Sequence, residues 1–339
     1  MFQVPQIKFV LLPFLLLVVI ACALNTPTKI KYKGVCFSAP SNQINENTFD
    51  PIVNINANAI AIIPYAFGNQ QNHSVVFNTD FQWWGEKDKG VRHCISQAKK
   101  QDLKVMLKPH IWFRGGYFHG DYNAGTEENW QQFESDFRDY ILHYAQVAAD
   151  LEVEIYCIAT EMKYFAINRP GFWYKLIKEI KTIYKGKLSY AANWDSYSNI
   201  IFWDVLDYIG IDAYFPLSPE KSPSTGDLNA AWNPYCQELE IISEKFNKQI
   251  IFAEYGYRSI DYNCKEPWDS NRKTGVNLQN QLNAYTSIYQ SVFNKDWFAG
   301  GFIWKWFSNH EKSGGIENNR FTPQNKPTEA LIRIQYQNL

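Results

Sequence analysis

The chain has 339 residues, enough for one large domain or two average ones, and its 33 Lys and Arg residues nearly balance 34 Asp and Glu residues. A formal net charge of −1 offers a polyanion no electrostatic attraction, which argues against a nucleic acid partner. The chain also holds 12 Trp, 21 Tyr and 23 Phe residues. Many belong in a core, but flat aromatic faces also suit the apolar faces of sugar rings.

The N-terminus is predicted to be an export signal. Lys8 precedes an apolar run that ends at Leu24, which is short for a membrane span of about 20 residues and typical of a signal-peptide core. The sequence Val-Ile-Ala-Cys that ends at Cys22 is similar to a bacterial lipobox. Residues 1–22 are therefore interpreted as a lipoprotein signal peptide with Cys22 as the candidate lipidation site; ordinary cleavage after Ala23 is the alternative. Either interpretation predicts export, to the bacterial cell envelope through a lipid anchor or to the periplasm or medium.

From about residue 30 onward, short apolar runs alternate with amphipathic stretches. The runs are mostly apolar rather than alternating, which indicates strands covered on both faces. Eight strands are predicted, at residues 34–37, 59–63, 104–108, 155–159, 188–191, 208–211, 250–253 and 301–304.

Helical periodicity lies between the predicted strands. The predicted helices cover residues 90–101, 130–151, 171–184, 232–246 and 278–293. Repeated strand–helix units over this length predict an α/β fold, a (β/α)8 TIM barrel, and the absence of a linker makes residues 30–339 a single catalytic domain. A doubly wound sheet is the alternative, but no Gly-rich phosphate loop follows the first strand. Residues 216–234 are rich in Pro, Ser and Asn, and are interpreted as a long loop at the active face.

The six cysteines show neither a CxxC pair nor a Cys/His cluster with zinc spacing, so no metal site is expected. Cys36 and Cys157 lie within predicted strands and are interpreted as small buried apolar residues. Cys236 and Cys264 could form a disulfide in an exported protein, although spacing alone does not give connectivity.

Two glutamates stand at the carboxyl ends of buried strands. Glu161 follows the run that ends at Thr160, and Glu254 follows the run that ends at Ala253. A carboxylate at such a position is costly unless it has a role there. Strand ends of a barrel meet at one rim, so these two side chains are predicted to form one reaction centre.

Other polar and aromatic residues also follow predicted strands. Lys108 is interpreted as an inward charge paired with a carboxylate, and the Gly-rich residues 115–120 as a mobile loop over the cleft. Such a rim suits a polyhydroxylated ligand. The candidate substrate-binding residues are His110, Trp112, Asn193, Trp194, Asp212, Tyr214, Tyr257 and Trp304.

A family resemblance extends from about Lys33 to Tyr336. It is carried by the segments Lys33-Gly-Val, Leu107-Lys-Pro-His-Ile-Trp, Ala159-Thr-Glu-Met, Tyr190-Ala-Ala-Asn-Trp, Ile209-Gly-Ile-Asp-Ala-Tyr-Phe, Phe252-Ala-Glu-Tyr-Gly and Gly300-Gly-Phe-Ile-Trp-Lys-Trp. In these segments the chain resembles glycoside hydrolase family 113, the retaining β-mannanases of the clan with the acid/base on strand 4 and the nucleophile on strand 7.

The resemblance implies that Glu161 is the acid/base and Glu254 the nucleophile. It implies that Tyr214 lies beside the nucleophile, that His110, Asn193, Asp212 and Trp304 line the cleavage subsite, and that no cofactor takes part. The expected substrate is a mannan or manno-oligosaccharide. Most of the wider clan has Asn before the strand-4 acid, where this chain, like the family, has Thr160.

Two alternatives stay open at this point. One is a β-glucanase or β-glucosidase-like barrel, because mannose and glucose differ only at the 2-hydroxyl. The other is a surface glycan-binding lipoprotein without activity, which the pair of strand-end carboxylates argues against. The sequence carries no signal for an oligomeric state.

Overall fold

The eight predicted apolar runs form the parallel strands of a closed barrel in the computed structural model, which describes residues 1–3 and 31–339. The strand order around the barrel is β1-β11-β10-β9-β8-β7-β5-β2. The predicted (β/α)8 barrel is confirmed, and the doubly wound alternative is wrong. The strands are β1 (Tyr32–Phe37), β2 (Ala59–Ile62), β5 (Lys104–Leu107), β7 (Ile155–Thr160), β8 (Lys187–Asn193), β9 (Ile209–Asp212), β10 (Ile250–Tyr255) and β11 (Phe298–Trp306).

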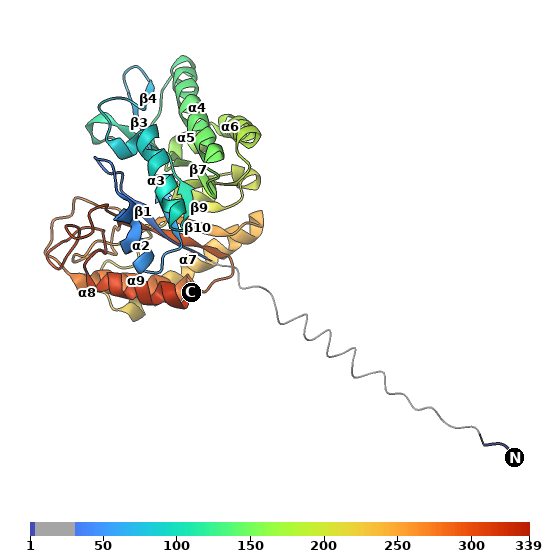
Figure 1. The fold of residues 1–339 in the computed structure, drawn as a ribbon, viewed down its shortest axis with the longest axis vertical. Coiled ribbons are helices and arrows are strands. Elements are labelled where there is room, and N and C mark those ends of the chain that lie inside the picture. Colours follow the sequence, from blue (N-terminus) through green and yellow to red (C-terminus); the bar gives the residue numbers. More distant parts are fainter. Residues whose placement is uncertain (4–30) are drawn as a thin grey trace. The chain divides into compact units, whose positions relative to one another are not determined.

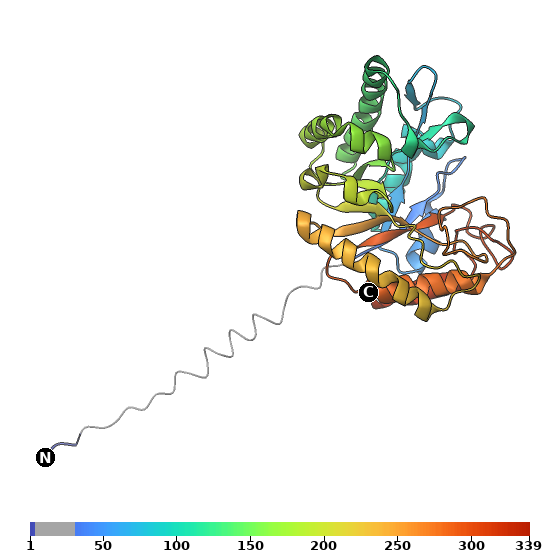
Figure 2. The ribbon, with the colours of Figure 1, turned by 180° about the vertical axis from the view of Figure 1, so that it is seen from behind.

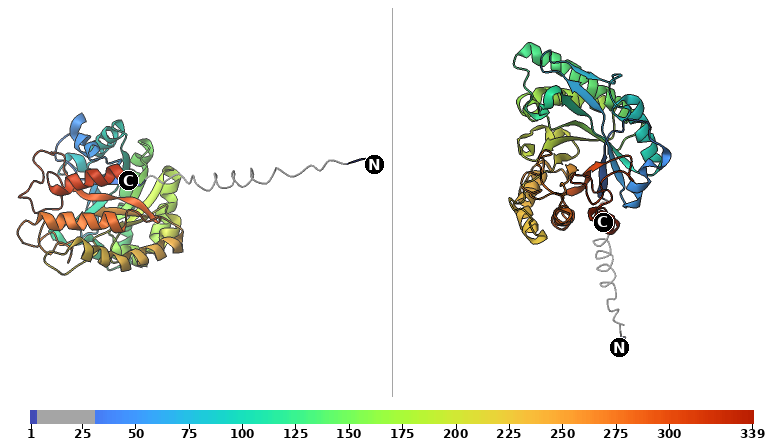
Figure 3. Two further views of the ribbon diagram at one scale, coloured as in Figure 1. Left: turned by 90° about the horizontal axis from the view of Figure 1, so that it is seen from below. Right: turned by 90° about the vertical axis from the view of Figure 1, so that its left-hand side faces the viewer.

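Helices surround the barrel, and each predicted helix is present. Figure 1 shows α4 and α6 on one side and α7, α8 and α9 on another, and Figure 2 shows α7 from behind. In Figure 3, α8 and α9 lie side by side, and they pack against each other. The helices are α2 (Asp50–Asn54), α3 (Asp88–Lys100), α4 (Glu127–Asp150), α5 (Lys163–Asn168), α6 (Pro170–Ile183), α7 (Thr225–Phe246), α8 (Leu278–Ser291) and α9 (Pro327–Asn338).

Two apolar layers hold the barrel together. Small inward-facing side chains fill its interior, among them Cys36, Ala61, Cys157 and Ala253. A larger layer lies between the strands and the helices and contains most of the buried aromatic residues. Because both faces of the sheet are buried, the strands read as continuous apolar runs. The prediction that Cys36 and Cys157 are buried is confirmed.

A second sheet of three strands, β4 (Val75–Phe77), β3 (Tyr65–Gly68) and β6 (His110–Phe113), lies next to the barrel. Pro64 and Pro109 explain its origin. Each follows a barrel strand by two residues, cannot donate to a strand ladder, and separates that strand from its continuation. β3 and β6 then pair with each other in parallel. These short strands were not among those predicted from the apolar pattern.

Helix α7 begins seven residues before its predicted start. The Ser224 hydroxyl accepts a hydrogen bond from Asp227 N, and the Asp227 carboxylate accepts one from Ser224 N, forming a capping box. The predicted loop at residues 216–234 is therefore wrong beyond residue 224. Pro234 lies inside the helix, so tertiary packing outweighs the low helix propensity of proline at this position.

Cys236 and Cys264 are both free thiols, so the suggested disulfide is wrong. Cys236 lies on α7 with its Sγ directed at Ser291 O, and Cys264 is fully buried in the loop after β10. The predicted lipidation site, Cys22, lies outside the described residues, as does most of the predicted signal peptide, and both stay predictions. In the described part of the chain, no helix has the length and apolar character needed to cross a membrane.

Candidate active site

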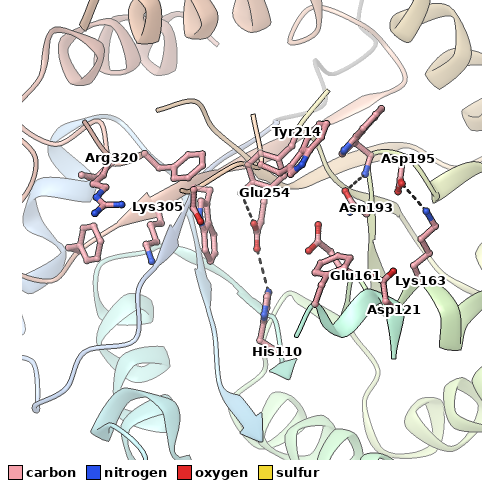
Figure 4. A pocket seen from close by; sticks show the side chains of 18 residues that line it. His110, Asp121, Glu161, Lys163, Asn193, Asp195, Tyr214, Glu254, Lys305 and Arg320 are labelled. Atoms are coloured by element: carbon pink, nitrogen blue, oxygen red, sulfur yellow. Dashed lines mark hydrogen bonds and ion pairs between the residues drawn. The ribbon is translucent and has the colours of Figure 1, made fainter. Parts of the chain in front are cut away.

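A cavity of about 950 Å³ opens at the carboxyl ends of the barrel strands. Figure 4 shows side chains from strands far apart in the sequence converging on it. Seven predicted site residues line the cavity: His110, Glu161, Asn193, Trp194, Tyr214, Glu254 and Trp304. The barrel topology brings them together, because parallel strands present their carboxyl ends at one rim.

Glu254 is almost fully buried, and three side chains bind its carboxylate. The Tyr214 hydroxyl donates to Oε2 over 2.7 Å. Lys108 Nζ donates to Oε1, and His110 Nε2 lies 3.5 Å from the same oxygen. Burial alone would raise the pKa of Glu254, but Lys108 and His110 outweigh burial and lower the pKa to about 2. Glu254 is therefore an ionised carboxylate over most of the pH range.

Glu161 is held in a different environment. It lies one residue beyond β7 with φ of 52°, a left-handed conformation that is uncommon for a residue with a side chain. Its amide N donates to Ala191 O over 2.7 Å, which fixes the turn. Burial, reinforced by the charge of Glu254, raises the pKa of Glu161 to about 8. Glu161 therefore carries a proton at neutral pH.

The two carboxyl groups point toward one another across the cavity (Figure 4). Glu161 holds a proton that it can donate, and Glu254 is ionised and can act as a nucleophile or base; each charge state follows from the neighbours of that group. A pair of carboxyl groups with their pKa values driven apart is the arrangement that glycosidic bond cleavage requires.

Lys108 and Asp212 form a buried layer beneath the carboxylate of Glu254. Burial works against the charge on Lys108, but the carboxyl groups of Asp212 and Glu254 raise its pKa well above the usual range. The prediction that Lys108 is an inward charge paired with a carboxylate is confirmed. Burial and the charge of Glu254 raise the pKa of Asp212. Its two oxygens have no hydrogen-bond partner within residues 31–339.

Aromatic rings form much of the cavity wall. The Trp304 ring lies parallel to the His110 ring, with centroids 6.4 Å apart. Trp194 and Trp268 also line the cavity and stack on each other with centroids 5.1 Å apart. The Asn193 side-chain oxygen accepts a hydrogen bond from Trp194 N, which orients its amide. Such walls offer stacking faces and a few fixed polar groups, as in carbohydrate sites.

Three predicted lining residues do not line the cavity. Trp112 lies on β6 two residues beyond His110, on the second sheet outside the cavity. Tyr257 follows Glu254 by three residues, and its ring is buried against Tyr285. Asp212 ends β9 with its side chain beneath Glu254 rather than in the open space. The assumption that every residue just past a strand lines the cavity was therefore wrong at these positions.

Several lining residues were missed because they lie on long loops without periodicity. Phe118 and Asp121 come from the loop after β6, and Trp268 and Ser270 from the loop after β10. Phe307, Arg320, Phe321 and Thr322 follow β11. The Gly-rich run at residues 115–120 pointed to a loop over the cleft, and Phe118 of that run does line the cavity.

Two further residues near the carboxyl pair were missed. His119 Nε2 lies 3.8 Å from Glu161 Oε2, and its ring is 5.6 Å from that of His110. Burial and the neighbouring His110 lower the pKa of His119 to about 3, so the ring is neutral. Lys305 lines the cavity beside the Trp304 ring. In the described residues, no group of three His, Cys, Asp or Glu side chains is arranged to hold a metal ion.

Comparisons with known proteins give one consistent result. The sequence model of glycoside hydrolase family 113 matches residues 41–326. Among solved structures, the chain is similar to a GH113 β-1,4-mannanase solved as a complex, with a TM-score of 0.79 and 21% identity over 91% of this chain and 99% of that one. It is similar to the GH113 β-mannanase from Alicyclobacillus acidocaldarius in complex with ManMIm, with a TM-score of 0.78 and 21% identity over 91% and 97% of the two chains.

A further structure of a GH113 β-1,4-mannanase gives a TM-score of 0.78 and 23% identity over 91% of this chain and all of that one. At these identities the structural matches show a shared fold. No curated protein matches the chain.

Proposed function

Because the chain belongs to glycoside hydrolase family 113, we propose that it is a retaining hydrolase that cleaves β-1,4-mannosidic bonds in mannan or manno-oligosaccharides. One observation carries the proposal. Glu161 and Glu254 face the same cavity with pKa values of about 8 and about 2, so one holds a proton while the other is ionised. The first can protonate a leaving oxygen, and the second can attack a carbon.

In the first step, a Glu254 carboxylate oxygen forms a bond to the anomeric carbon, and the glycosidic C–O bond breaks. Glu161 gives its proton to the departing oxygen, so that the leaving sugar departs as a neutral alcohol. The product is a glycosyl ester on Glu254 with inverted configuration at the anomeric carbon.

In the second step, Glu161 is ionised and removes a proton from water. The water oxygen attacks the anomeric carbon and displaces the Glu254 carboxylate. Two inversions return the original configuration. Lys108 and Tyr214 stabilise Glu254 as an anion at the start and at the end of the cycle, which favours its departure in this step.

The remaining lining residues are proposed to bind the sugar. Trp304 offers an apolar face at the end of β11, and the Asn193 amide is the candidate partner of the 2-hydroxyl. Thr160 is buried, and its hydroxyl is directed at Pro109 O. It therefore cannot form a hydrogen bond with the 2-hydroxyl of the sugar. The side chains at this hydroxyl would decide between mannose and glucose.

Two variants test the reaction, one that removes the nucleophile and one that removes the acid/base. Glu254→Ala should abolish turnover of manno-oligosaccharides while binding persists in calorimetry. Glu161→Ala should still cleave a mannoside with an activated aryl leaving group, and added azide should give a β-mannosyl azide. Normal hydrolysis of mannan by Glu254→Ala, or an α-configured product by NMR, would rule out the proposed mechanism.

Substrate identity is tested separately. Release of reducing sugar is measured from β-1,4-manno-oligosaccharides and from β-1,4-gluco-oligosaccharides of equal length. Faster cleavage of the glucose series would reassign the enzyme to the β-glucanases. Binding of either series without any hydrolysis would instead support a glycan-binding protein without activity.

A further inference from the structure

The second sheet continues directly from the catalytic centre. β3 and β6 pair in parallel with Tyr65 opposite His110 and Phe67 opposite Trp112. His110 Nε2 lies 3.5 Å from the nucleophile, and the Tyr65 ring lies 5.4 Å from the His110 ring. The first row of this sheet, Tyr65 and His110, therefore adjoins the cavity through His110. The second row, Phe67 and Trp112, lies two residues farther along the same strands.

The second row faces the same side as the first. Side chains two residues apart in a strand point to one face, so Phe67 and Trp112 lie on the face of Tyr65 and His110. The burial pattern agrees with this assignment, because the intervening Ala66 and Ile111 are buried. The two rows are about 7 Å apart, given the rise of a strand per residue.

The second row is apolar and open to solvent. Trp112 is 55% exposed, and Val76, which lies opposite Phe67 on β4, is 42% exposed. Phe81 is 61% exposed and packs edge-on against Phe67 with ring centroids 5.5 Å apart. In the described residues, Trp112 stacks on no other aromatic ring. A row of large exposed apolar side chains adjoining a ligand site marks a binding surface rather than a core.

We propose that Phe67, Phe81 and Trp112 form an aromatic platform that binds sugar units distant from the bond being cleaved. The occupant is the same β-1,4-linked chain that enters the cavity, because the platform continues the face that carries His110. The apolar faces of its pyranose rings would stack on the exposed aromatic rings. This inference rests on the proposed function, and it makes longer oligosaccharides better substrates than short ones.

The test is the dependence of kcat/KM on oligosaccharide length. Trp112→Ala should lower the ratio of kcat/KM for long to short manno-oligosaccharides by about tenfold, the effect of losing one stacking contact. Trp112→Phe should retain most of that ratio. Ile241→Ala removes an apolar side chain that is 65% exposed on α7, and should leave the ratio at the wild-type value.

An equal loss on long and short substrates, or an unchanged ratio in Trp112→Ala, would overturn the platform. The same measurement with β-1,4-gluco-oligosaccharides keeps the test valid if the enzyme prefers glucose, so its failure is distinct from failure of the mannanase proposal. Light scattering tests an alternative occupant by measuring the oligomeric state. If the wild type is a dimer, Trp112→Ala is a monomer and the ratio of kcat/KM for long to short substrates is unchanged, the surface binds a second copy of the chain instead.

Discussion

The Tyr214 hydroxyl donates a 2.7 Å hydrogen bond to Oε2 of Glu254, while Lys108 binds the other oxygen of the same carboxylate. Tyr214 lies two residues past β9 and Glu254 lies within β10, and these neighbouring strands align Asp212 with Glu254. Both oxygens of the proposed nucleophile are therefore fixed by side chains that follow other barrel strands. A carboxylate held in this way attacks with little reorganisation.

Tyr214→Phe should lower kcat by about 10- to 100-fold, because a hydrogen bond to a charged group contributes about 1.5–3 kcal/mol. The variant keeps the ring and removes only the hydroxyl. Steady-state kinetics on a manno-oligosaccharide checks this, with Tyr174→Phe as the control, since that hydroxyl bonds to Ile201 O and Asp204 outside the cavity. Wild-type kcat in Tyr214→Phe would show that the hydroxyl has no part in catalysis.

The pH dependence of kcat/KM should be bell-shaped. Activity requires Glu254 ionised, so it rises as pH increases through about 2, and it requires Glu161 protonated, so it falls as pH increases through about 8. Glu161→Gln assayed with an activated aryl mannoside and azide should lose the basic limb, because no proton is then needed from this residue. A basic limb that survives in that assay would belong to another group.

Lys108→Met should move the acidic limb to higher pH by about one to three pH units. Lys108 opposes the effect of burial on Glu254, and a neighbouring opposite charge lowers a carboxyl pKa by about that amount. Lys104→Met, at the start of the strand that Lys108 follows and outside the cavity, is the control. An unchanged acidic limb in Lys108→Met would mean that His110 and Tyr214 suffice to hold the charge.

Much of this site could be predicted because of where strands end. Glu161 and Glu254 were identified because each closes an apolar run, and a barrel brings strand ends to one rim. Trp112 was misplaced because Pro109 interrupts the barrel strand, and the chain then enters a second sheet. Arg320 and Trp268 were missed because their loops carry no periodicity. Their positions depend on packing between segments that are far apart in the sequence.

Helix α7 illustrates the same limit at the level of secondary structure. Pro234 and the surrounding Ser and Asn residues favoured a loop, yet the capping box at Ser224 begins the helix seven residues before its predicted start. Ser224→Ala should destabilise the protein by about 1 kcal/mol, the usual effect of losing an N-cap. Thermal unfolding checks this, with Thr225→Ala in the same turn as the control. No loss of stability would mean that the interior packing of α7 alone fixes its start.

His119 provides the last prediction, because its imidazole lies close to the proposed acid/base, Glu161. Its ring is neutral, its Nε2 lies 3.8 Å from Glu161 Oε2, and at this distance the ring is expected to limit the access of water to that carboxyl group. His119→Ala should admit water, weaken the burial that raises the pKa of Glu161, and so move the basic limb of kcat/KM to lower pH. A merely structural role would lower stability and leave that limb in place. His73→Ala, whose imidazole bonds to the Tyr122 hydroxyl, is the control. If the basic limb stays near pH 8 in His119→Ala, the raised pKa of Glu161 is caused by the charge of Glu254 and by burial against the barrel wall, without a contribution from His119.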